Sequence, residues 1–414
     1  MKQISEYNIF RAFASRNFML YFFGRAVSQF GTWMQRTAVV WVVYAMTHSA
    51  FLLGVTIFAE QFPSFLFSIL GGVVADRFNR YTVIKITQIT SMIQAVLLAL
   101  LVITGHTTVW AILLLSVILG IINAFDVPAR QSLINDVVAR PEDLPNALSL
   151  STATASLAQL LGPALSGIVL SAYGAGVCFL LNAASFGGVI LSLLLMKLPA
   201  YLPKKTDKKV MTDFAEGFAY IKNTPEIGLI AVMLALVSLL VLPYNTLLPV
   251  FAKVVFKGDA STFGYINSFV GIGAVMGTIF LASRKSGANL KRILFFSTVL
   301  LGIGLISFSQ IRNFPAAMFF AAIAGYGSIA QFTISNILVQ SGATPAMRGR
   351  ALGILLMATF GMLPVGSLLI GAISEHIGAQ TTVLAQGILT LVIALLFVKF
   401  LTRPANKLNM QPTQ

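Results

Sequence analysis

The stretch GGVVADRFNR (residues 71–80) holds one acid and two bases in ten positions, directly after about twenty residues that carry a single charge, Glu60. A long apolar run that ends in a charge cluster is typical of a helix leaving a membrane, because charges are readily solvated only outside the hydrocarbon. The whole chain of 414 residues is 57% hydrophobic and 10% charged, whereas soluble proteins average roughly 45–50% and about 25%. The sequence therefore predicts an all-α membrane protein.

Twelve apolar runs come close to the roughly 20 residues that a helix needs to span a bilayer. They lie at residues 17–46, 50–73, 83–104, 108–126, 147–171, 176–197, 226–252, 262–282, 292–311, 314–338, 351–374 and 379–401. The breaks between them are short, as in bundles of consecutive membrane helices. We therefore expect twelve transmembrane helices.

The basic residues alternate between the two sides of the membrane. If the N-terminus is inside, 23 of the 28 Lys and Arg fall on the termini and the inner loops. Lys253, Lys257 and Arg312 are in outer loops, and Arg25 and Arg36 are within a span. This asymmetry follows the positive-inside rule, so both termini are predicted to be cytoplasmic. It also accounts for the net charge of +15 without a nucleic-acid partner.

The two halves of the chain show an internal sequence repeat. At an offset of 204 residues, Pro141, Ala147, Leu148, Gly162, Leu165, Gly167, Gly174 and Ala175 recur as Pro345, Ala351, Leu352, Gly366, Leu369, Gly371, Gly378 and Ala379. A repeat of six helices gives two halves of equal orientation, as in one large class of transporters. We predict six-helix bundles at residues 1–198 and 225–402, a cytoplasmic linker at 199–224 and a tail at 403–414.

Several blocks resemble one known family. GVVADRFNRYTVI (72–84) is similar to the signature loop between helices 2 and 3 of the major facilitator superfamily. FDVPARQSLINDVV (125–138), GPALSG (162–167) and RGRALGILL (348–356) resemble blocks of the bacterial group that includes enterobactin exporters and macrolide efflux proteins, in the same order. The resemblance covers nearly the whole chain. It implies an alternating-access transporter in a bacterial cytoplasmic membrane.

The same resemblance implies a gating latch on the cytoplasmic side. In this superfamily the loop acid lies against the N-terminal end of helix 11, where the helix dipole favours negative charge, and the loop bases pair with an acid at the foot of helix 4. The corresponding residues are Gly72, Asp76, Arg77, Arg80 and Asp126, with helix 11 beginning near Arg348. The alternative is an ordinary solvated loop.

Charges inside a predicted span are costly and therefore tend to have a partner or a function. Arg36 precedes the outer end of its helix by ten residues, and Glu60 follows the start of the next helix by ten. At about 1.5 Å per residue, both lie about 15 Å deep, near the midplane of a core of about 30 Å. They could form a pair that only fixes helix packing, or a proton-coupling site. Arg25 either snorkels to the interface or contacts an anionic substrate.

Helix 5 contains a glycine motif similar to that of the superfamily's antiporters. Gly162, Pro163 and Gly167 would kink the helix and allow another backbone to approach closely. On helix 8, Gly273 and Gly277 offer the small face that such an approach needs. Ordinary helix packing is the alternative.

A predicted substrate cavity completes the set of candidate sites. Trp33 shares a helix face with Arg36, and Tyr244 and Asn245 lie in the Pro-broken segment VLPYNTLLP. The cavity residues predicted are Arg25, Trp33, Arg36, Tyr244, Asn245 and Gln331. The single Cys and three His have no metal-ligand spacing, and no nucleophile–base pair or phosphate loop is evident. We therefore expect no enzyme activity, metal or cofactor.

These observations predict a secondary active exporter of a small amphipathic organic molecule, either a siderophore or a drug-like compound. With no ATP-binding motif, an ion gradient must supply the energy, and Glu60 and Arg36 are the predicted proton-coupling pair. Its partners would be the substrate, protons and the lipid bilayer, and we expect a monomer. A transport-inactive receptor or scaffold on the same fold, and a proton-coupled importer, are the alternatives.

Overall fold

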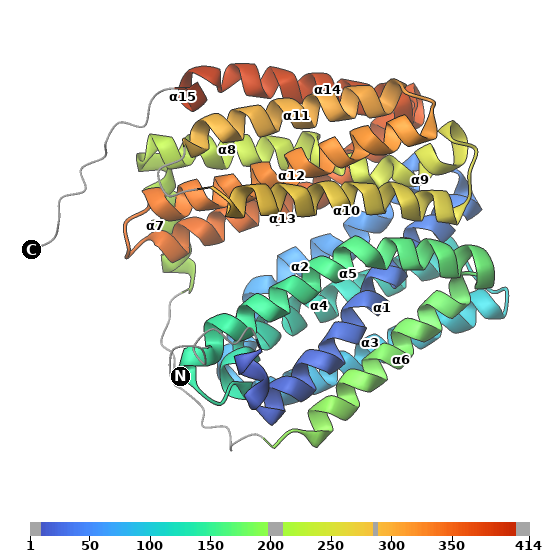
Figure 1. The fold of residues 1–414 in the computed structure, drawn as a ribbon. Helices are drawn as coiled ribbons and strands as arrows, with labels where there is room; N and C mark the ends of the chain where they lie inside the picture. Colours follow the sequence, from blue (N-terminus) through green and yellow to red (C-terminus); the bar gives the residue numbers. More distant parts are fainter. Residues whose placement is uncertain (1–9, 198–209, 285–288, 403–414) are drawn as a thin grey trace, which may run out of the picture. The chain divides into compact units, whose positions relative to one another are not determined.

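The computed structural model describes residues 10–197, 210–284 and 289–402, all as helices, turns and short connections (Figure 1). Within those residues no strand is present, in agreement with the predicted all-α class. The predicted tail (403–414) and residues 199–209 of the predicted linker lie outside the described part. The long helices are α1 (Arg16–Thr47), α2 (Ala50–Arg77), α3 (Arg80–Ile103), α4 (Val109–Val137), α5 (Leu144–Tyr173), α6 (Ala175–Leu195), α8 (Pro225–Leu240), α10 (Ala260–Ala282), α11 (Leu290–Gln310), α12 (Phe314–Gly342), α13 (Arg348–Ile377) and α14 (Ala379–Leu396). Shorter helices are α7 (Val210–Asn223), α9 (Leu248–Val250) and α15 (Val398–Thr402).

Eleven membrane-spanning candidates occur among the described residues, each long and apolar enough to cross a bilayer. The helix α1 has 32 residues and is also long enough to cross a bilayer. It contains Arg16, Arg25 and Arg36 and is less apolar than the eleven candidates. Together with α1, these spans correspond to the twelve helices expected from the sequence. The chain is therefore a multi-pass membrane protein.

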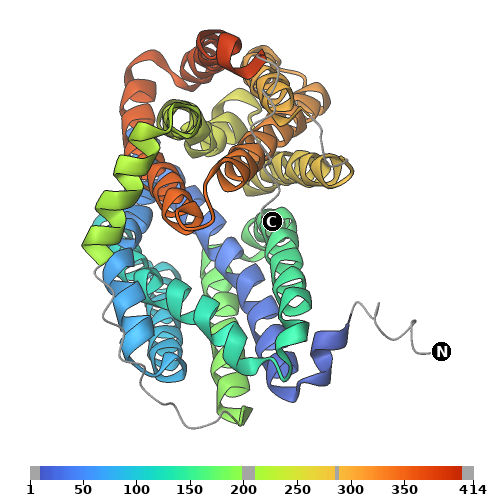
Figure 2. The same ribbon diagram turned by 90° about the vertical axis from the view of Figure 1, so that its left-hand side faces the viewer.

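Two compact units make up the chain. The first comprises residues 1–208 and 248–268, and the second residues 209–247 and 269–414. In the first unit α1 packs against α5 and α6, α3 packs against α4 and α6, and α2 packs against α4 (Figure 1). In the second unit α11 packs against α12 and α14, and α8 packs against α13. Figure 2 shows that the helices within each unit run side by side.

The connection between α2 and α3 is shorter than the sequence suggests. The helix α2 continues to Arg77 and α3 begins at Arg80, so Asp76 lies in a helical turn and not in a loop. Asn79 caps α3, because its side-chain oxygen accepts a hydrogen bond from the backbone N–H of Tyr81 at 3.0 Å. This cap explains how a residue other than glycine is accommodated at the turn.

The internal repeat is visible in the backbone. Gly174 ends α5 and Gly378 ends α13, and both have a φ of 82°, a left-handed conformation that favours glycine. The glycines of the repeat also occupy equivalent places. Gly162 of α5 lies against Trp33 of α1, and Gly366 of α13 lies against α8, the first long helix of the second unit.

The predicted span 226–252 is a broken helix. It ends as α8 at Leu240, and a tight 3-10 segment (Leu242–Leu247) and a wide turn (Phe251–Val255) follow. Pro243 and Pro249 cause the break, because proline lacks an N–H and clashes with the preceding turn. At the break, the Gln386 side chain donates hydrogen bonds to the carbonyls of Leu240 and Val241, at 3.0 and 3.2 Å.

Candidate functional site

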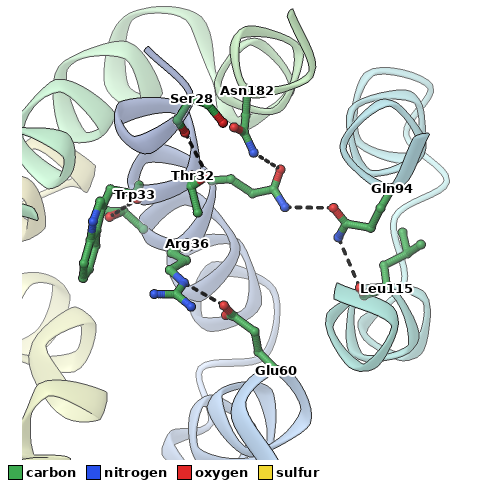
Figure 3. Close-up of polar contacts among 10 residues, drawn as sticks. Ser28, Thr32, Trp33, Arg36, Glu60, Gln94, Leu115 and Asn182 are labelled. Atoms are coloured by element: carbon green, nitrogen blue, oxygen red, sulfur yellow. Dashed lines mark hydrogen bonds and ion pairs between the residues drawn. The ribbon is translucent and has the colours of Figure 1, made fainter. Parts of the chain in front are cut away.

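An ion pair joins α1 and α2 in the first unit. Arg36 Nε donates to Glu60 Oε1 at 2.7 Å (Figure 3). The Glu60 side chain is 13% exposed and that of Arg36 37%, so the carboxylate is largely covered while the guanidinium stays accessible. The guanidinium also lies 5.5 Å from the ring centroid of Trp33, a cation–π contact. The structure thus contains the predicted pair, whereas its role in proton coupling stays a prediction.

Close contact between α2 and α4 fixes the backbone at Glu60. Gly120 of α4 lies against the carbonyl oxygen of Glu60, and a Cβ at this position would overlap that oxygen. Further along, Gly71 of α2 lies in the same way against the carbonyl of Ala124. Such mutual glycine contacts allow two membrane helices to approach closely, and they set the position of Glu60 without touching its carboxylate.

The second unit repeats this arrangement between α10 and α12. Gly273 lies against the carbonyl of Ala322, and Gly325 lies against the carbonyl of Val270. Gly277 also faces α12. The prediction that Gly273 and Gly277 form a face for helix 5 is therefore wrong, because both are used within the second unit.

The predicted close approach between α5 and the eighth predicted span, α10, is present, but other residues of α10 make it. Gly162 faces Trp33, and a Cβ there would lie 2.5 Å from the Trp33 Cβ. The glycine of α5 that contacts α10 is Gly167. A Cβ added at Gly167 would lie 2.9 Å from the Ala260 oxygen and 3.0 Å from Gly264 Cα. Two residues that are five positions apart in a helix point about 140° away from each other. Gly162 and Gly167 therefore contact different helices. The carbonyl of Pro163 also contacts Gly264.

A chain of buried amides crosses the first unit behind the ion pair. Asn182 Nδ2 donates to Gln35 Oε1 at 2.8 Å, Gln35 Nε2 donates to Gln94 Oε1 at 3.0 Å, and Gln94 Nε2 donates to the Leu115 carbonyl at 3.2 Å. This amide chain runs from Asn182 to Leu115 in Figure 3 and links α6, α1, α3 and α4. Its three side chains are at most 2% exposed. Because Gln35 precedes Arg36, the amide chain holds α1 with Arg36 directed toward α2.

We expect Gln35→Leu to lower the stability of the protein by about 1–3 kcal/mol, because it leaves buried groups of Gln94 and Asn182 without hydrogen bonds. The triple replacement of Gln35, Gln94 and Asn182 by Leu should recover part of this loss, because no polar group is then stranded. Gln131→Leu, at an exposed position of α4, is the control. Thermal unfolding in detergent measures all three, and equal melting temperatures for Gln35→Leu and the control would contradict the role given to the amide chain.

Asp126 does not pair with the bases of the α2–α3 connection, contrary to the prediction. It is 3% exposed, and its carboxylate accepts hydrogen bonds from Thr87 Oγ1 at 2.8 Å and Gln88 Nε2 at 2.9 Å and pairs with Arg130 at 2.5 Å. Arg80 pairs with Asp136 at 3.1 Å. Asp126 precedes Asp136 by ten residues, so the two acids are about 15 Å apart along α4. Asp126 is therefore out of reach of Arg80.

The remaining residues of the predicted latch lie at the end of α2. Asp76 and Arg77 are exposed in its last turn, and a Cβ at Gly72 would meet no atom within 4 Å among the described residues. The contact predicted between Asp76 and the helix that begins near Arg348 stays a prediction.

The predicted cavity residues of the second unit have different environments. Tyr244 and Gln331 are fully buried, whereas Asn245 is exposed and donates to the Leu242 carbonyl at 3.3 Å. The Tyr244 hydroxyl lies near Ser328 and Asn245 but makes no hydrogen bond of good geometry within the described residues. Both amide atoms of Gln331 lack a partner there too. Tyr244 and Gln331 are therefore less accessible to a substrate than Arg36 and Trp33.

Sequence reasoning missed Gln35, Gln94, Gly120 and Asp136. Amide side chains inside apolar spans were an available signal for the first two, because polar groups in membrane helices need hydrogen-bond partners. Glycine is common in this chain, with 33 residues, so nothing in the sequence distinguishes Gly120. Asp136 lies one to two turns beyond Arg130, and only the observed length of α4 shows that it reaches Arg80.

A bundle of apolar helices with a half-covered ion pair is the arrangement of a multi-pass membrane protein, and charged groups inside such helices commonly have a function. The family model described as "Transmembrane secretion effector" matches residues 8–414. The chain belongs to this family of major facilitator superfamily transporters, which are not enzymes. A small-molecule substrate and a membrane environment follow from that membership.

Relatives of known name extend over nearly the whole chain. The chain is 28% identical over 386 residues to the staphyloferrin A transporter of Staphylococcus aureus, covering 91% of this chain and 94% of that protein. It is 22% identical to the multidrug efflux pump Tap of Mycolicibacterium fortuitum, with coverage of 93% and 95%. It is 25% identical to the enterobactin exporter EntS of Shigella boydii, with coverage of 92% and 91%. The resemblance found in the sequence is therefore confirmed.

Solved transporters share the fold. The nucleoside transporter NupG superposes with a TM-score of 0.72 at 18% identity, covering 94% of this chain and 100% of that one. At this identity the likeness concerns the fold alone, which agrees with the predicted major facilitator fold.

Proposed function

We propose that this protein exports a small amphipathic organic molecule, a siderophore or a drug-like compound, across a bacterial cytoplasmic membrane by proton antiport. Relatives named as an enterobactin exporter and as an efflux pump support the direction and the substrate class. The asymmetry of basic residues supports cytoplasmic termini. The monomer is the proposed working form.

The observation that carries the proposal is the ion pair between Arg36 and Glu60. The acids Glu60 and Asp126 lie well inside α2 and α4, away from the helix ends, and their surroundings differ. Asp126 accepts hydrogen bonds from Thr87 and Gln88 and pairs with Arg130, so both of its oxygens are engaged. Glu60 has one contact, with Arg36, among the described residues. Glu60 is thus the carboxylate that can exchange a proton with the smaller loss of contacts.

The ion pair suggests how a proton gradient drives the cycle. A proton that reaches Glu60 removes its charge and releases Arg36, and loss of that proton restores the pair. The two states differ in the attraction between α1 and α2, so protonation favours one conformation over the other. If the substrate leaves from the conformation that accepts the proton, uptake of protons and release of substrate alternate, as antiport requires.

A deletion strain tests this function. We expect it to grow more slowly than its parent under iron limitation and to retain siderophore inside the cell, if the substrate is a siderophore. If the substrate is drug-like, the strain should instead become sensitive to the compound and accumulate it. Plasmid-borne wild type should reverse either effect. Unchanged growth, secretion and drug sensitivity would contradict export and favour a scaffold on the same fold.

A further inference from the structure

Trp33 contacts the ion pair on the side away from Glu60. The Arg36 guanidinium lies between the Glu60 carboxylate and the Trp33 ring (Figure 3). Its central carbon is 5.5 Å from the ring centroid, within the roughly 6 Å over which an aromatic face attracts a cation. Among the described residues, the side chain of Arg36 thus has one charged partner and one aromatic partner.

Protonation of Glu60 changes the balance between these two partners. A neutral carboxyl no longer compensates the charge of Arg36, and an uncompensated charge inside a membrane is costly. The ring of Trp33 still attracts the guanidinium, and tryptophan does so better than any other aromatic residue. Trp33 therefore stabilises the state in which the ion pair is broken, and it makes proton uptake by Glu60 easier.

The helix α5 holds Trp33 in this place. A Cβ added at Gly162 would lie 2.5 Å from Trp33 Cβ and 3.4 Å from Trp33 Cγ. The backbone of α5 is therefore in direct contact with the base of the Trp33 side chain, which has no room to shift toward α5. The rest of Trp33 is only half-buried, so its ring stays within reach of Arg36.

Other charged groups are too far away to replace either partner of Arg36. Arg25, half-buried on α1, is eleven residues or about 16 Å from Arg36. Asp126 is six residues or about 9 Å beyond Gly120, where α4 contacts Glu60. The helices α5, α6 and α9, which also pack against α1, contain no Asp, Glu, Lys, Arg or His. The nearest further charges on α1 to α4 all lie toward the predicted inner ends: Arg25, Asp76, Arg77, Lys85, Asp126 and Arg130.

We propose that Trp33 is a positioning residue of the coupling pair: its ring holds the Arg36 guanidinium while Glu60 carries the proton, and Gly162 keeps the ring in place. This inference rests on the proposed proton antiport. It gives the glycine motif of α5 a part in coupling, through Trp33.

Fluorescence of Trp33 tests the proposal without substrate or gradient. The chain has three tryptophans, so Trp41→Phe with Trp110→Phe leaves Trp33 as the only one. In this purified full-length protein in detergent, we expect the tryptophan emission to change with pH, because the guanidinium moves between Glu60 and the ring. The change should disappear in Glu60→Gln and in Arg36→Gln.

Gly162→Ala should move the midpoint of this emission change to lower pH, because a displaced ring stabilises the broken pair less and Glu60 then needs more acid to take up a proton. The expected shift is about half a unit to one unit, the size of a cation–π contact. Gly188→Ala, where a Cβ meets no atom within 4 Å among the described residues, should leave the midpoint unchanged.

The pH dependence of gradient-driven transport is the second measurement. Trp33→Leu should move its midpoint to lower pH by about half a unit to one unit, Trp33→Phe by less, and Trp110→Leu, at a position that is 78% exposed, not at all. Emission that does not respond to pH, a response that survives Arg36→Gln, or equal midpoints for Trp33→Leu and Trp110→Leu would overturn the proposal. A pH response of Trp33 in a protein without proton-driven transport would support the proposal and contradict the antiport.

Discussion

Glu60→Gln is expected to abolish proton-driven transport while substrate binding and substrate exchange persist. Glutamine keeps the shape and most of the hydrogen-bonding capacity of glutamate but cannot ionise, so the contact with Arg36 remains possible and the proton cycle does not. Uptake into inverted membrane vesicles under an imposed pH gradient measures the first activity, and counterflow without a gradient measures the second. Loss of both would point to misfolding, which the expression level and the melting temperature of the variant can reveal.

Glu60→Ala should be more harmful to folding than Glu60→Gln. It leaves Arg36 without its counterion, and breaking a fully buried pair costs about 3–5 kcal/mol. We expect less than that here, because 37% of the Arg36 side chain remains exposed. The double replacement Arg36→Gln with Glu60→Gln should regain much of the stability without regaining coupling. A Glu60→Gln variant that still concentrates substrate in response to pH would show that the pair only fixes helix packing.

Gly120→Ala should reduce transport strongly, although it changes neither member of the ion pair. The added methyl overlaps the backbone oxygen of Glu60, and a helix backbone cannot yield as a flexible side chain can. We expect α2 to move away from α4, with a cost of about 1–3 kcal/mol for overpacking and a displaced Glu60 carboxylate. Melting temperature and gradient-driven uptake should therefore fall together.

Gly188→Ala is the matched control for this replacement. Gly188 lies within α6, and a Cβ there meets no atom within 4 Å in the described residues. Alanine is the better helix former, by about 1 kcal/mol, so this variant should be at least as stable as the wild type and transport normally. Equal behaviour of Gly120→Ala and Gly188→Ala would refute the view that the α2–α4 contact positions Glu60.

Much of the fold could be predicted from the sequence, because the bilayer imposes simple rules on length, hydropathy and charge. The ion pair could be predicted for the same reason. Arg36 and Glu60 lie in consecutive helices at equal distances from a common outer end, and helical rise converts those distances into depth. The correspondence of Gly174 with Gly378 could also be predicted, because each glycine ends a helix in a conformation that favours glycine.

Rotation about the helix axes could not be predicted. Whether Gly162 or Gly167 faces α10, and whether Gly273 faces α5 or α12, depends on which helices are neighbours and on their crossing, and an almost uniformly apolar helix carries little amphipathic signal. The partner of Arg80 depended on how far α4 extends beyond the apolar run. The predicted run ended at Asp126, whereas the helix continues to Val137, which brings Asp136 to Arg80.

The most direct test of proton antiport through Glu60 is proton movement in liposomes that contain the purified protein and a pH-sensitive dye. When the substrate identified by the growth assays is added on one side, wild type should move protons in the direction opposite to the substrate, and Glu60→Gln should move none. Equal proton movement in both proteins, or protons and substrate moving in the same direction, would contradict the account. No substrate-dependent proton movement in wild type would favour a scaffold.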